Sequence, residues 1–325
     1  MKKENQTSET DFIFIGFSYL PHLRSLLFFI FLLLYTFTLL GNAITILIIC
    51  LNLQLHTPMY FFLANLSFLD IFNTSVTIPK MLISDITKKQ SISYTGCITQ
   101  LFLFTSLASA ECVLLAVMAY DRYLAICYPL HYMEVMNNKV CVLLATLAWL
   151  GGFLQSTVHT IFTFQLSFCQ PRLIDGFFCE VPSLLKLSCS LTFLNEVVLF
   201  CFGGLVSLTP FLLTFISYTV ILLTVFNIPS SEGRSKAFST CGSHLTVVAM
   251  FYGAATFVYF RPTSSYSLPV DRLVSVFYSL LTPMVNPVIY SLKNNDVKGA
   301  LKKMFEKKRS YISMKIFSTS LTLFI

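Results

Sequence analysis

Two acidic residues, Asp70 and Glu111, lie deep within long apolar stretches of the sequence. An ionised side chain at the centre of a bilayer costs about 2.5–3.5 kcal/mol on insertion scales, so a residue of this kind is a candidate for a functional role. A buried acid without a partner becomes neutral. Two acids that face each other can instead share a proton or a cation. The chemistry that this pair predicts is therefore proton or cation binding between helices.

A second pair of charges, Asp121 and Arg122, stands where an apolar stretch that begins near Cys97 meets water. At a helix end both charges can reach the interface, because an arginine extends its head group toward water. One interpretation is a simple marker of the membrane boundary. The other is an ion pair that opens and closes as part of a switch. For a lone pair of this kind the boundary marker is the expected interpretation, and the flanking Tyr120 and Tyr123 bear on the choice only as part of the longer motif described below.

The sequence lacks the residues that a histidine metal site, a retinal Schiff base or a transport path would need. His159 and His244 have no second histidine at helical spacing to complete a metal site. A retinal-binding protein needs a buried lysine for a Schiff base, and residues 273–292 contain none. A transporter or channel would show internal repeats and a polar path, and neither is visible. The residues therefore argue against an enzyme, a retinal protein and a transporter.

The composition requires a membrane to position these side chains. Of 325 residues, 55% are hydrophobic and 11% are charged, whereas soluble domains carry roughly 25% charged residues. A spanning helix needs about 20 mostly apolar residues. Seven stretches meet this requirement, at residues 25–50, 58–82, 97–125, 140–162, 196–226, 237–260 and 270–292. We therefore expect an extracellular N-terminus over residues 1–24, a seven-helix membrane domain over 25–292 and a cytoplasmic tail over 293–325.

The direction of insertion follows from the basic residues. Lysine and arginine are modestly more numerous on the side of the C-terminal tail, and such residues prefer the cytoplasm. The tail carries most of the net charge of +7, and a basic segment beside a bilayer attracts anionic lipid. We expect residues 294–309 to form a basic amphipathic helix on the membrane surface. No soluble domain is present to carry nucleic-acid binding.

Four cysteines, Cys97, Cys169, Cys179 and Cys189, lie on the predicted outer side. Disulfides form in that oxidising environment, and four cysteines allow three pairings that the residues alone do not distinguish. A glycosylation sequon begins at Asn5 in the polar N-terminal segment. Both features agree with an exterior N-terminus.

Several stretches, taken in order, resemble the motifs of the olfactory receptors within the rhodopsin-like G-protein-coupled receptors. The strings are GN at 41–42, LHTPMYFFLANLSFLD at 55–70, MAYDRYLAIC at 118–127, Pro210 and SY at 217–218, KAFSTCGSHL at 236–245 and PMVNPVIY at 283–290. The strings in the second and sixth spans separate olfactory receptors from other rhodopsin-like receptors, the nearest alternative class. The resemblance implies an all-α membrane protein with a seven-transmembrane, rhodopsin-like helix bundle. It also implies a receptor at the plasma membrane of olfactory neuron cilia that activates a heterotrimeric stimulatory G protein and raises cAMP.

The same resemblance assigns a switch at the cytoplasmic end. Asp121 would hold Arg122 at rest, and Arg122 would be released to the G protein on activation, when the polar inner end of the sixth helix parts from the third. Pro287 removes a backbone hydrogen bond and predicts a kink in the seventh helix, with Tyr290 one turn below Asn286. The expected coupling residues are Asp121, Arg122, Tyr123, Tyr218, Lys236, Ser239, His244, Asn286, Pro287 and Tyr290.

Two further features follow from the resemblance. A sodium ion would be held by Asp70, Glu111 and Asn286, and the alternative is a protonated, hydrogen-bonded pair of acids that joins helices. No other cofactor is expected. The resemblance also selects the disulfides, Cys97 with Cys179 and Cys169 with Cys189.

A cavity between the helices is the default ligand site in a bundle. Phe104 stands where amine receptors carry an acid, so we expect a small, volatile, neutral and mostly apolar odorant. In the sixth helix, Tyr252 and Gly253 replace the tryptophan and proline of the wider receptor class. The expected wall comprises Phe104, Thr105, Ala108, Ser109, Val206, Tyr252, Ala255, Thr256, Tyr259, Tyr278 and Ser279.

Overall fold

The computed structural model describes residues 11–16, 22, 24–259, 277–293, 297–300 and 302. Within its helices, the side chains of residues 236, 239, 240, 257–259, 277, 278 and 290–293 lie outside the description. The helices are α1 (Arg24–Leu51), η2 (Leu53–Leu55), α2 (Pro58–Thr87), α3 (Tyr94–Cys127), α4 (Tyr132–Val135), α5 (Asn138–Phe164), α6 (Val181–Leu185), α7 (Phe193–Val198), η3 (Leu199–Gly203), α8 (Gly204–Phe226), α9 (Ser231–Tyr259), η5 (Phe277–Leu281) and α11 (Thr282–Lys293). The strands are β1 (Phe12–Phe14), β2 (Ser91–Ile92) and β3 (Leu173–Ile174).

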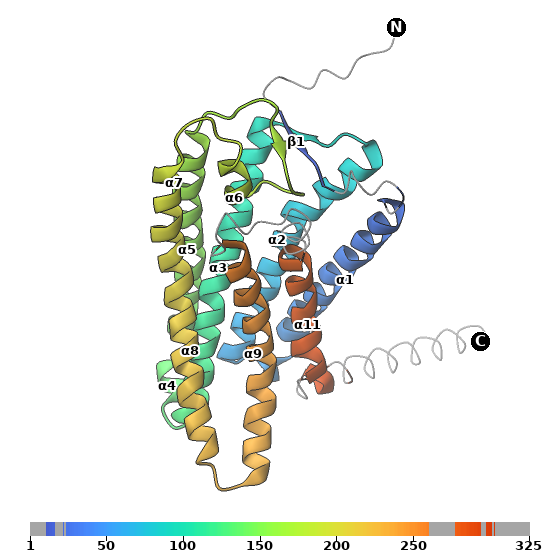
Figure 1. Cartoon of the computed structure of the whole chain (residues 1–325). Helices are drawn as coiled ribbons and strands as arrows, with labels where there is room; N and C mark the ends of the chain where they lie inside the picture. The colour runs from blue at the N-terminus through green and yellow to red at the C-terminus, as the bar shows by residue number, and fades with distance from the viewer. Residues whose placement is uncertain are drawn as a thin grey trace, which may run out of the picture.

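The described residues form seven long helical segments, which pack into one bundle (Figure 1). Among the residues that the structure describes, five helices are long and apolar enough to cross a membrane: α1, α2, α3, α5 and the continuous helix formed by α7, η3 and α8. The helices α9 and η5–α11 complete the bundle. Helix α9 is less apolar than the others because its first turns carry serine and charged residues. The predicted seven-helix membrane fold is confirmed.

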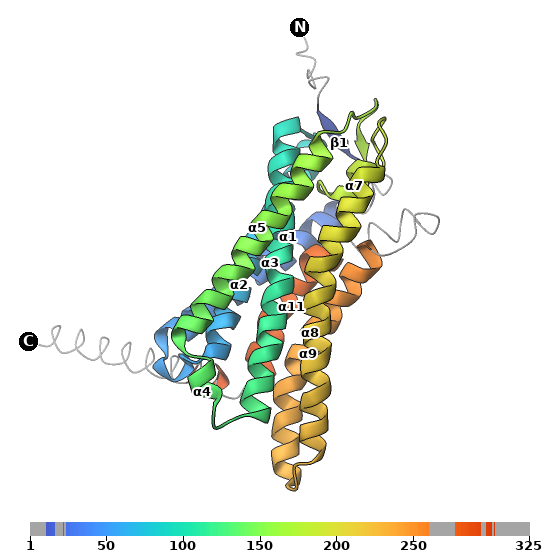
Figure 2. The ribbon, with the colours of Figure 1, turned by 90° about the vertical axis from the view of Figure 1, so that its left-hand side faces the viewer.

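The helices are longer than the apolar stretches that predicted them. Helix α9 begins at Ser231 rather than at 237, and α2 continues to Thr87 rather than to 82. Figure 2 shows α8 and α9 running side by side to a tight connection at the lower end. Hydropathy detects only the part of a helix that lies in lipid, so the turns that extend into water were missed. The predicted start of the seventh span, residue 270, lies outside the described residues.

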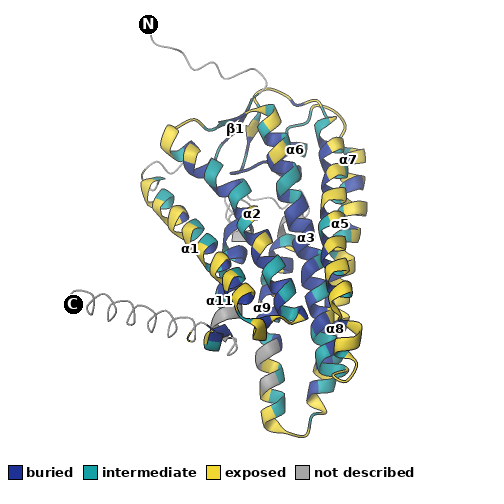
Figure 3. Ribbon diagram, turned by 180° about the vertical axis from the view of Figure 1, so that it is seen from behind, coloured by how far each residue is buried: buried dark blue, intermediate teal, exposed yellow. Residues whose placement is uncertain are grey.

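Helix α3 is the central rod. In the most apolar 18-residue stretch of α3, 67% of the residues are buried, against 17% in the corresponding stretch of α1. Figure 3 shows the exposed residues gathered on the outer faces of α1, α5 and α8. Gly152 of α5 permits close contact with α3, because a Cβ there would lie 2.4 Å from the carbonyl oxygen of Ser106. The hydroxyl of Ser156 donates to the carbonyl oxygen of Phe102 on the same face. The central position places α3 in contact with every candidate site described below.

A small sheet with the strand order β2-β1-β3 covers the outer end of the bundle. Strand β1 pairs antiparallel with β2 and parallel with β3, and Phe12 and Phe14 are buried in a cluster that contains both Cys97 and Cys179. Disulfides join Cys97 to Cys179 and Cys169 to Cys189, so both predicted pairings are confirmed. The sheet itself was not predicted, because strands of two or three residues have no readable periodicity.

Candidate functional site

The ion pair at the inner end of α3 is closed. Oδ2 of Asp121 accepts hydrogen bonds from Nε and Nη2 of Arg122, at 3.1 and 2.5 Å. The hydroxyl of Tyr132, in the short helix α4, donates to the other carboxylate oxygen of Asp121 at 2.7 Å. Burial and the charge of Asp121 raise the pKa of the Tyr132 hydroxyl well above its ordinary value, so this group is a neutral donor at physiological pH. Asp121 is therefore held by two partners, one on each oxygen.

A second contact closes the same end of the bundle. The hydroxyl of Tyr218 on α8 and Nδ1 of His244 on α9 share a hydrogen bond of 2.6 Å. Tyr218 belongs to an apolar cluster with Ala119 of α3 and Cys241 of α9. In this state the inner ends of α3, α8 and α9 are packed together.

The inner half of the sixth helix, α9, carries the polar residues Ser243 and His244. Ser243 and His244 are 7% and 2% exposed, so both face the bundle interior. Tyr123 is half-buried beside the same cluster. The side chains of three other predicted coupling residues, Lys236, Ser239 and Tyr290, lie outside the described part of the chain.

Halfway along the bundle, polar groups join three helices. Nδ2 of Asn286 on α11 donates to Oδ2 of Asp70 on α2 at 2.9 Å. Both residues are buried, as is Glu111 of α3, which interacts electrostatically with Asp70. Three oxygens in this cluster have no hydrogen-bond partner within the described part of the chain: Oδ1 of Asp70, Oε1 of Glu111 and Oδ1 of Asn286. Unpartnered buried oxygens fit a hard cation, although the described residues contain no group of three His, Cys, Asp or Glu side chains placed to hold a metal.

The seventh helix is fixed to the first beside this cluster. Nδ2 of Asn42 donates to the carbonyl oxygen of Pro283 at 3.1 Å. Gly41 lies against the ring of Pro287, where a Cβ would come within 3.0 Å of Cγ. The Gly41–Asn42 motif of the sequence thus holds α1 against the proline-containing segment of α11.

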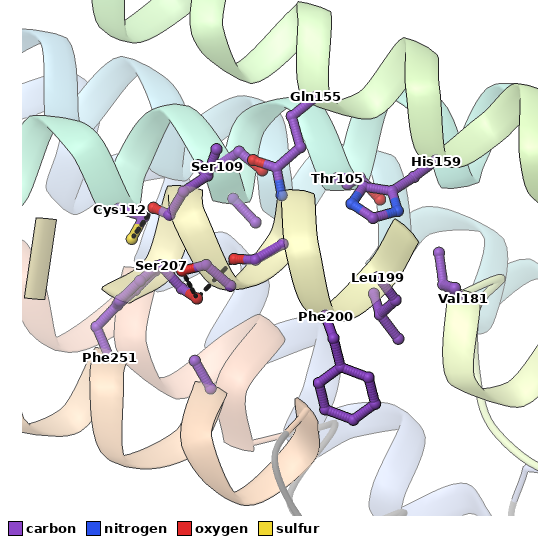
Figure 4. A pocket seen from close by; sticks show the side chains of 15 residues that line it. Thr105, Ser109, Cys112, Gln155, His159, Val181, Leu199, Phe200, Ser207 and Phe251 are labelled. Carbon is purple, nitrogen blue, oxygen red and sulfur yellow. Dashed lines mark hydrogen bonds between the residues drawn. The ribbon is translucent and has the colours of Figure 1, made fainter. Parts of the chain in front are cut away.

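A cavity of about 100 Å³ lies between α3, α5, η3–α8 and α9 in the outer half of the bundle (Figure 4). This space exceeds several-fold the roughly 10–15 Å³ needed to hold one water molecule. The described residues that line it are mostly apolar, and none of them has an acidic or basic side chain apart from a histidine. The residues around it are Thr105, Ala108, Ser109, Cys112, Gln155, His159, Val181, Leu199, Phe200, Gly203, Gly204, Val206, Ser207, Phe251 and Ala255.

Five of the eleven residues expected at a ligand site line this cavity: Thr105, Ala108, Ser109, Val206 and Ala255. The remaining described residues take other positions.

Phe104 is buried against Phe178 of the outer loop, with ring centroids 4.7 Å apart. Ser279 is buried away from the cavity wall and Thr256 is exposed. Tyr252 sits behind the wall, where its hydroxyl donates to the carbonyl oxygen of Cys112 at 3.2 Å. The side chains of Tyr259 and Tyr278 lie outside the described residues.

Sequence reasoning missed two parts of the cavity wall, one on α5 and one on η3. Gln155 and His159 project from α5, and Leu199 to Gly203 form a single turn of π-helix, η3. The signal for the first pair was present, because two polar residues four positions apart share one face of an otherwise apolar helix. A π-helical turn has no comparable sequence signal, although such turns occur frequently at functional sites.

Seven helices, an ion pair at the inner end of the central helix and a disulfide from its outer end to a loop define a rhodopsin-like receptor bundle. The crystal structure of squid rhodopsin has this fold, with a TM-score of 0.69 over 84% of this chain and 78% of that chain, at 21% sequence identity.

The chain belongs to the olfactory receptor family, whose family model, described as "Olfactory receptor", matches residues 31–308. It is 49% identical to olfactory receptor 5AR1 of Mus musculus over 95% of this chain and 99% of that receptor. It is 48% identical to olfactory receptor 5AR1 of Homo sapiens, with the same coverage. Members of this family are multi-pass receptors of the plasma membrane that sense odorants and couple to G proteins, and they are not enzymes.

Proposed function

We propose that this receptor binds a small, neutral, mostly apolar odorant in the cavity between α3, α5, α8 and α9, and activates a stimulatory G protein that raises cAMP. The observation that carries the ligand class is the wall of the cavity, which combines apolar side chains with a few hydroxyl, amide and imidazole groups. A charged ligand would lose its hydration there without gaining an ion pair, which is costly.

The contact between Cys112 and Tyr252 supports a path from the ligand to the switch. Cys112 lines the cavity, and its backbone carbonyl oxygen accepts a hydrogen bond from the hydroxyl of Tyr252 on α9. A ligand that displaces Cys112 or Phe251 therefore acts on α9, the helix that carries His244 at its inner end. The ligand shifts the equilibrium only to the extent that it binds the open state better than the closed one.

Opening of the inner end breaks two contacts in this proposal. The Tyr218–His244 hydrogen bond parts as α9 moves from α8, and Arg122 leaves Asp121 for the C-terminus of the G protein. Tyr123, Lys236, Ser239, Asn286, Pro287 and Tyr290 complete the proposed coupling region.

The experiment that tests this function is a cAMP reporter assay in cells that express a stimulatory G protein, run against a chemically diverse odorant panel. We expect at least one neutral odorant to act, and Arg122→Ala to lower the maximal response at least tenfold with partial surface expression. Lys139→Ala is the matched control, because it removes an exposed cation near the inner surface that takes no part in the ion pair. An Arg122→Ala receptor that signals normally, or a panel in which only charged amines act, would contradict the proposal.

Three accompanying proposals concern the surroundings of the bundle. The N-terminus faces the exterior and carries a glycan at Asn5, the basic tail binds anionic cytoplasmic lipid, and the receptor resides in olfactory cilia. Asn5 and most of the tail lie outside the described residues.

We also propose that the cluster of Asp70, Glu111 and Asn286 holds a sodium ion in the closed state. Support comes from its three unpartnered oxygens. When bound, the ion would supply a positive charge that offsets the buried carboxylates. A shared proton between the two acids is the competing interpretation.

A further inference from the structure

The α5 wall of the cavity carries two buried polar side-chain atoms, one from Gln155 and one from His159. Gln155 and His159 lie one helical turn apart and both line the cavity (Figure 4). Oε1 of Gln155 and Nε2 of His159 are buried, and neither has a hydrogen-bond partner among the described residues. His159 is 3% exposed. Leaving such groups unpaired costs free energy, so a ligand that pairs them binds more tightly.

Two polar side chains elsewhere on the cavity wall, Ser207 and Cys112, do not pair with these atoms. The hydroxyl of Ser207 on α8 donates to the carbonyl oxygen of Gly203, the last residue of η3, at 2.6 Å. The thiol of Cys112 points to the carbonyl oxygen of Val206 at 3.5 Å and to the hydroxyl of Tyr252 at the same distance. The donor hydrogens of these two side chains are therefore already used within the protein.

The π-helical turn leaves room in front of the imidazole. A Cβ added at Gly203 would lie 3.7 Å from Nε2 of His159, which is ordinary contact. With only hydrogen there, the space beside the ring is open to a small group. The shape of η3 and the missing side chain thus place a polar recess at the α5 wall, while Val206, Phe251 and Ala255 form the apolar remainder.

We propose that the odorant carries a hydroxyl group, an alcohol or a phenol, that binds in this recess between Gln155 and His159. An amide oxygen only accepts hydrogen bonds, whereas Nε2 donates or accepts according to the tautomer. A hydroxyl matches both, because it donates one hydrogen and accepts others. An ether, ester, ketone or aldehyde only accepts and leaves the Gln155 oxygen unpaired. This inference rests on the proposed function and specifies its ligand class.

The test is a series of matched ligands with one skeleton and different polar groups. Primary alcohols of six to ten carbons are compared with the aldehyde and the methyl ether of each chain length, and phenol analogues with the corresponding benzaldehydes and anisoles. In the wild type we expect the best alcohol or phenol to act at roughly tenfold lower concentration than its ether, the difference expected for one unpaired buried acceptor. The readout is the half-maximal concentration for cAMP production.

The variants are Gln155→Leu and His159→Phe, which keep the approximate shape and remove the polar atoms. Each should reduce the alcohol-to-ether preference to about threefold or less while the response to the ether persists. Thr157→Val is the control, because Thr157 is an exposed polar residue of the same helix. Its hydroxyl donates to the backbone carbonyl oxygen of Phe153, one turn earlier in that helix. A merely structural role would lower all responses in parallel and leave the preference unchanged, and that result would overturn the inference. Surface expression of each variant is measured on the same cells.

The failures of the two proposals are distinguishable. If ethers and aldehydes act as well as alcohols, or if only odorants without a hydroxyl act, the hydroxyl inference is overturned and the receptor function stands. If no odorant gives a response that depends on Arg122, the proposed function fails, and the hydroxyl inference fails with it.

Discussion

At the scale of single residues, the carboxylate of Asp121 is the most informative group. One of its oxygens accepts hydrogen bonds from the guanidinium of Arg122, and the other accepts a hydrogen bond from the hydroxyl of Tyr132. The motif at 118–127 predicted the first contact, since neighbouring opposite charges at a helix end form an ion pair. It could not predict the second, because Tyr132 lies in a connection whose path depends on how α3 and α5 pack.

We expect Tyr132→Phe to raise signalling in the absence of ligand several-fold. A hydrogen bond to a charged group contributes about 1.5–3 kcal/mol, and its loss frees Asp121 and weakens the closed state. The measurement is nucleotide exchange on the G protein in isolated membranes. Because the pKa of the Tyr132 hydroxyl is raised, the difference from wild type should be the same at pH 6 and pH 8. Unchanged basal exchange, or the same increase in the exposed control Tyr120→Phe, would contradict this role.

At the scale of elements, the crossing of α3 and α5 positions the cavity. Ser156 binds the backbone of α3 on the face of α5 that also carries Gly152, and the next turns of both helices bear Thr105, Ser109 and His159. The distance between the two helices therefore sets the width of the ligand site. A glycine pair, Gly151 and Gly152, is visible in the sequence, but only the structure shows which of the two faces α3.

The two glycines give a matched comparison. A Cβ at Gly152 would lie 2.4 Å from the oxygen of Ser106, whereas nothing lies within 4 Å of one at Gly151. We expect Gly152→Ala to destabilise the receptor by about 1–3 kcal/mol, since an overpacked crossing must open. Gly151→Ala should be neutral or slightly stabilising, because alanine favours the helix more than glycine does. The measurement is the melting temperature of each purified variant in lipid nanodiscs. Equal melting temperatures of the two variants would contradict the close crossing of α3 and α5.

At the scale of the whole molecule, the bundle is held together at three depths. The sheet and two disulfides cover the outer end, Asp70 joins α2 to α11 through Asn286 halfway down, and Tyr218 joins α8 to α9 at the inner end. In the activation proposed above, the two lower contacts change while the disulfides at the outer end remain. The central cluster is therefore a suitable place for an ion to favour the closed state.

We expect sodium to lower agonist potency several-fold relative to N-methylglucamine at equal ionic strength in isolated membranes. Asp70→Asn should abolish this effect, because the ion loses its carboxylate ligand and binds too weakly to favour the closed state. Glu134→Gln, which neutralises an exposed acid outside the cluster, should retain it. Equal potency of the wild type in the two salts would favour a shared proton between Asp70 and Glu111 instead.

The sequence by itself determined the number of helices, the family, the two disulfides through the family resemblance, and the residues of the inner ion pair. These properties reside in apolar length and in local strings, which tertiary contacts do not change. Only the tertiary structure decided which polar side chains meet: Tyr218 with His244, and Tyr132 with Asp121. It also decided that Gln155 and His159 face the cavity with atoms that have no partner among the described residues. A helix of lipid-compatible composition can rotate about its axis without changing its hydropathy, so close packing, through crossings such as the one at Gly152, selects the face that each helix turns inward.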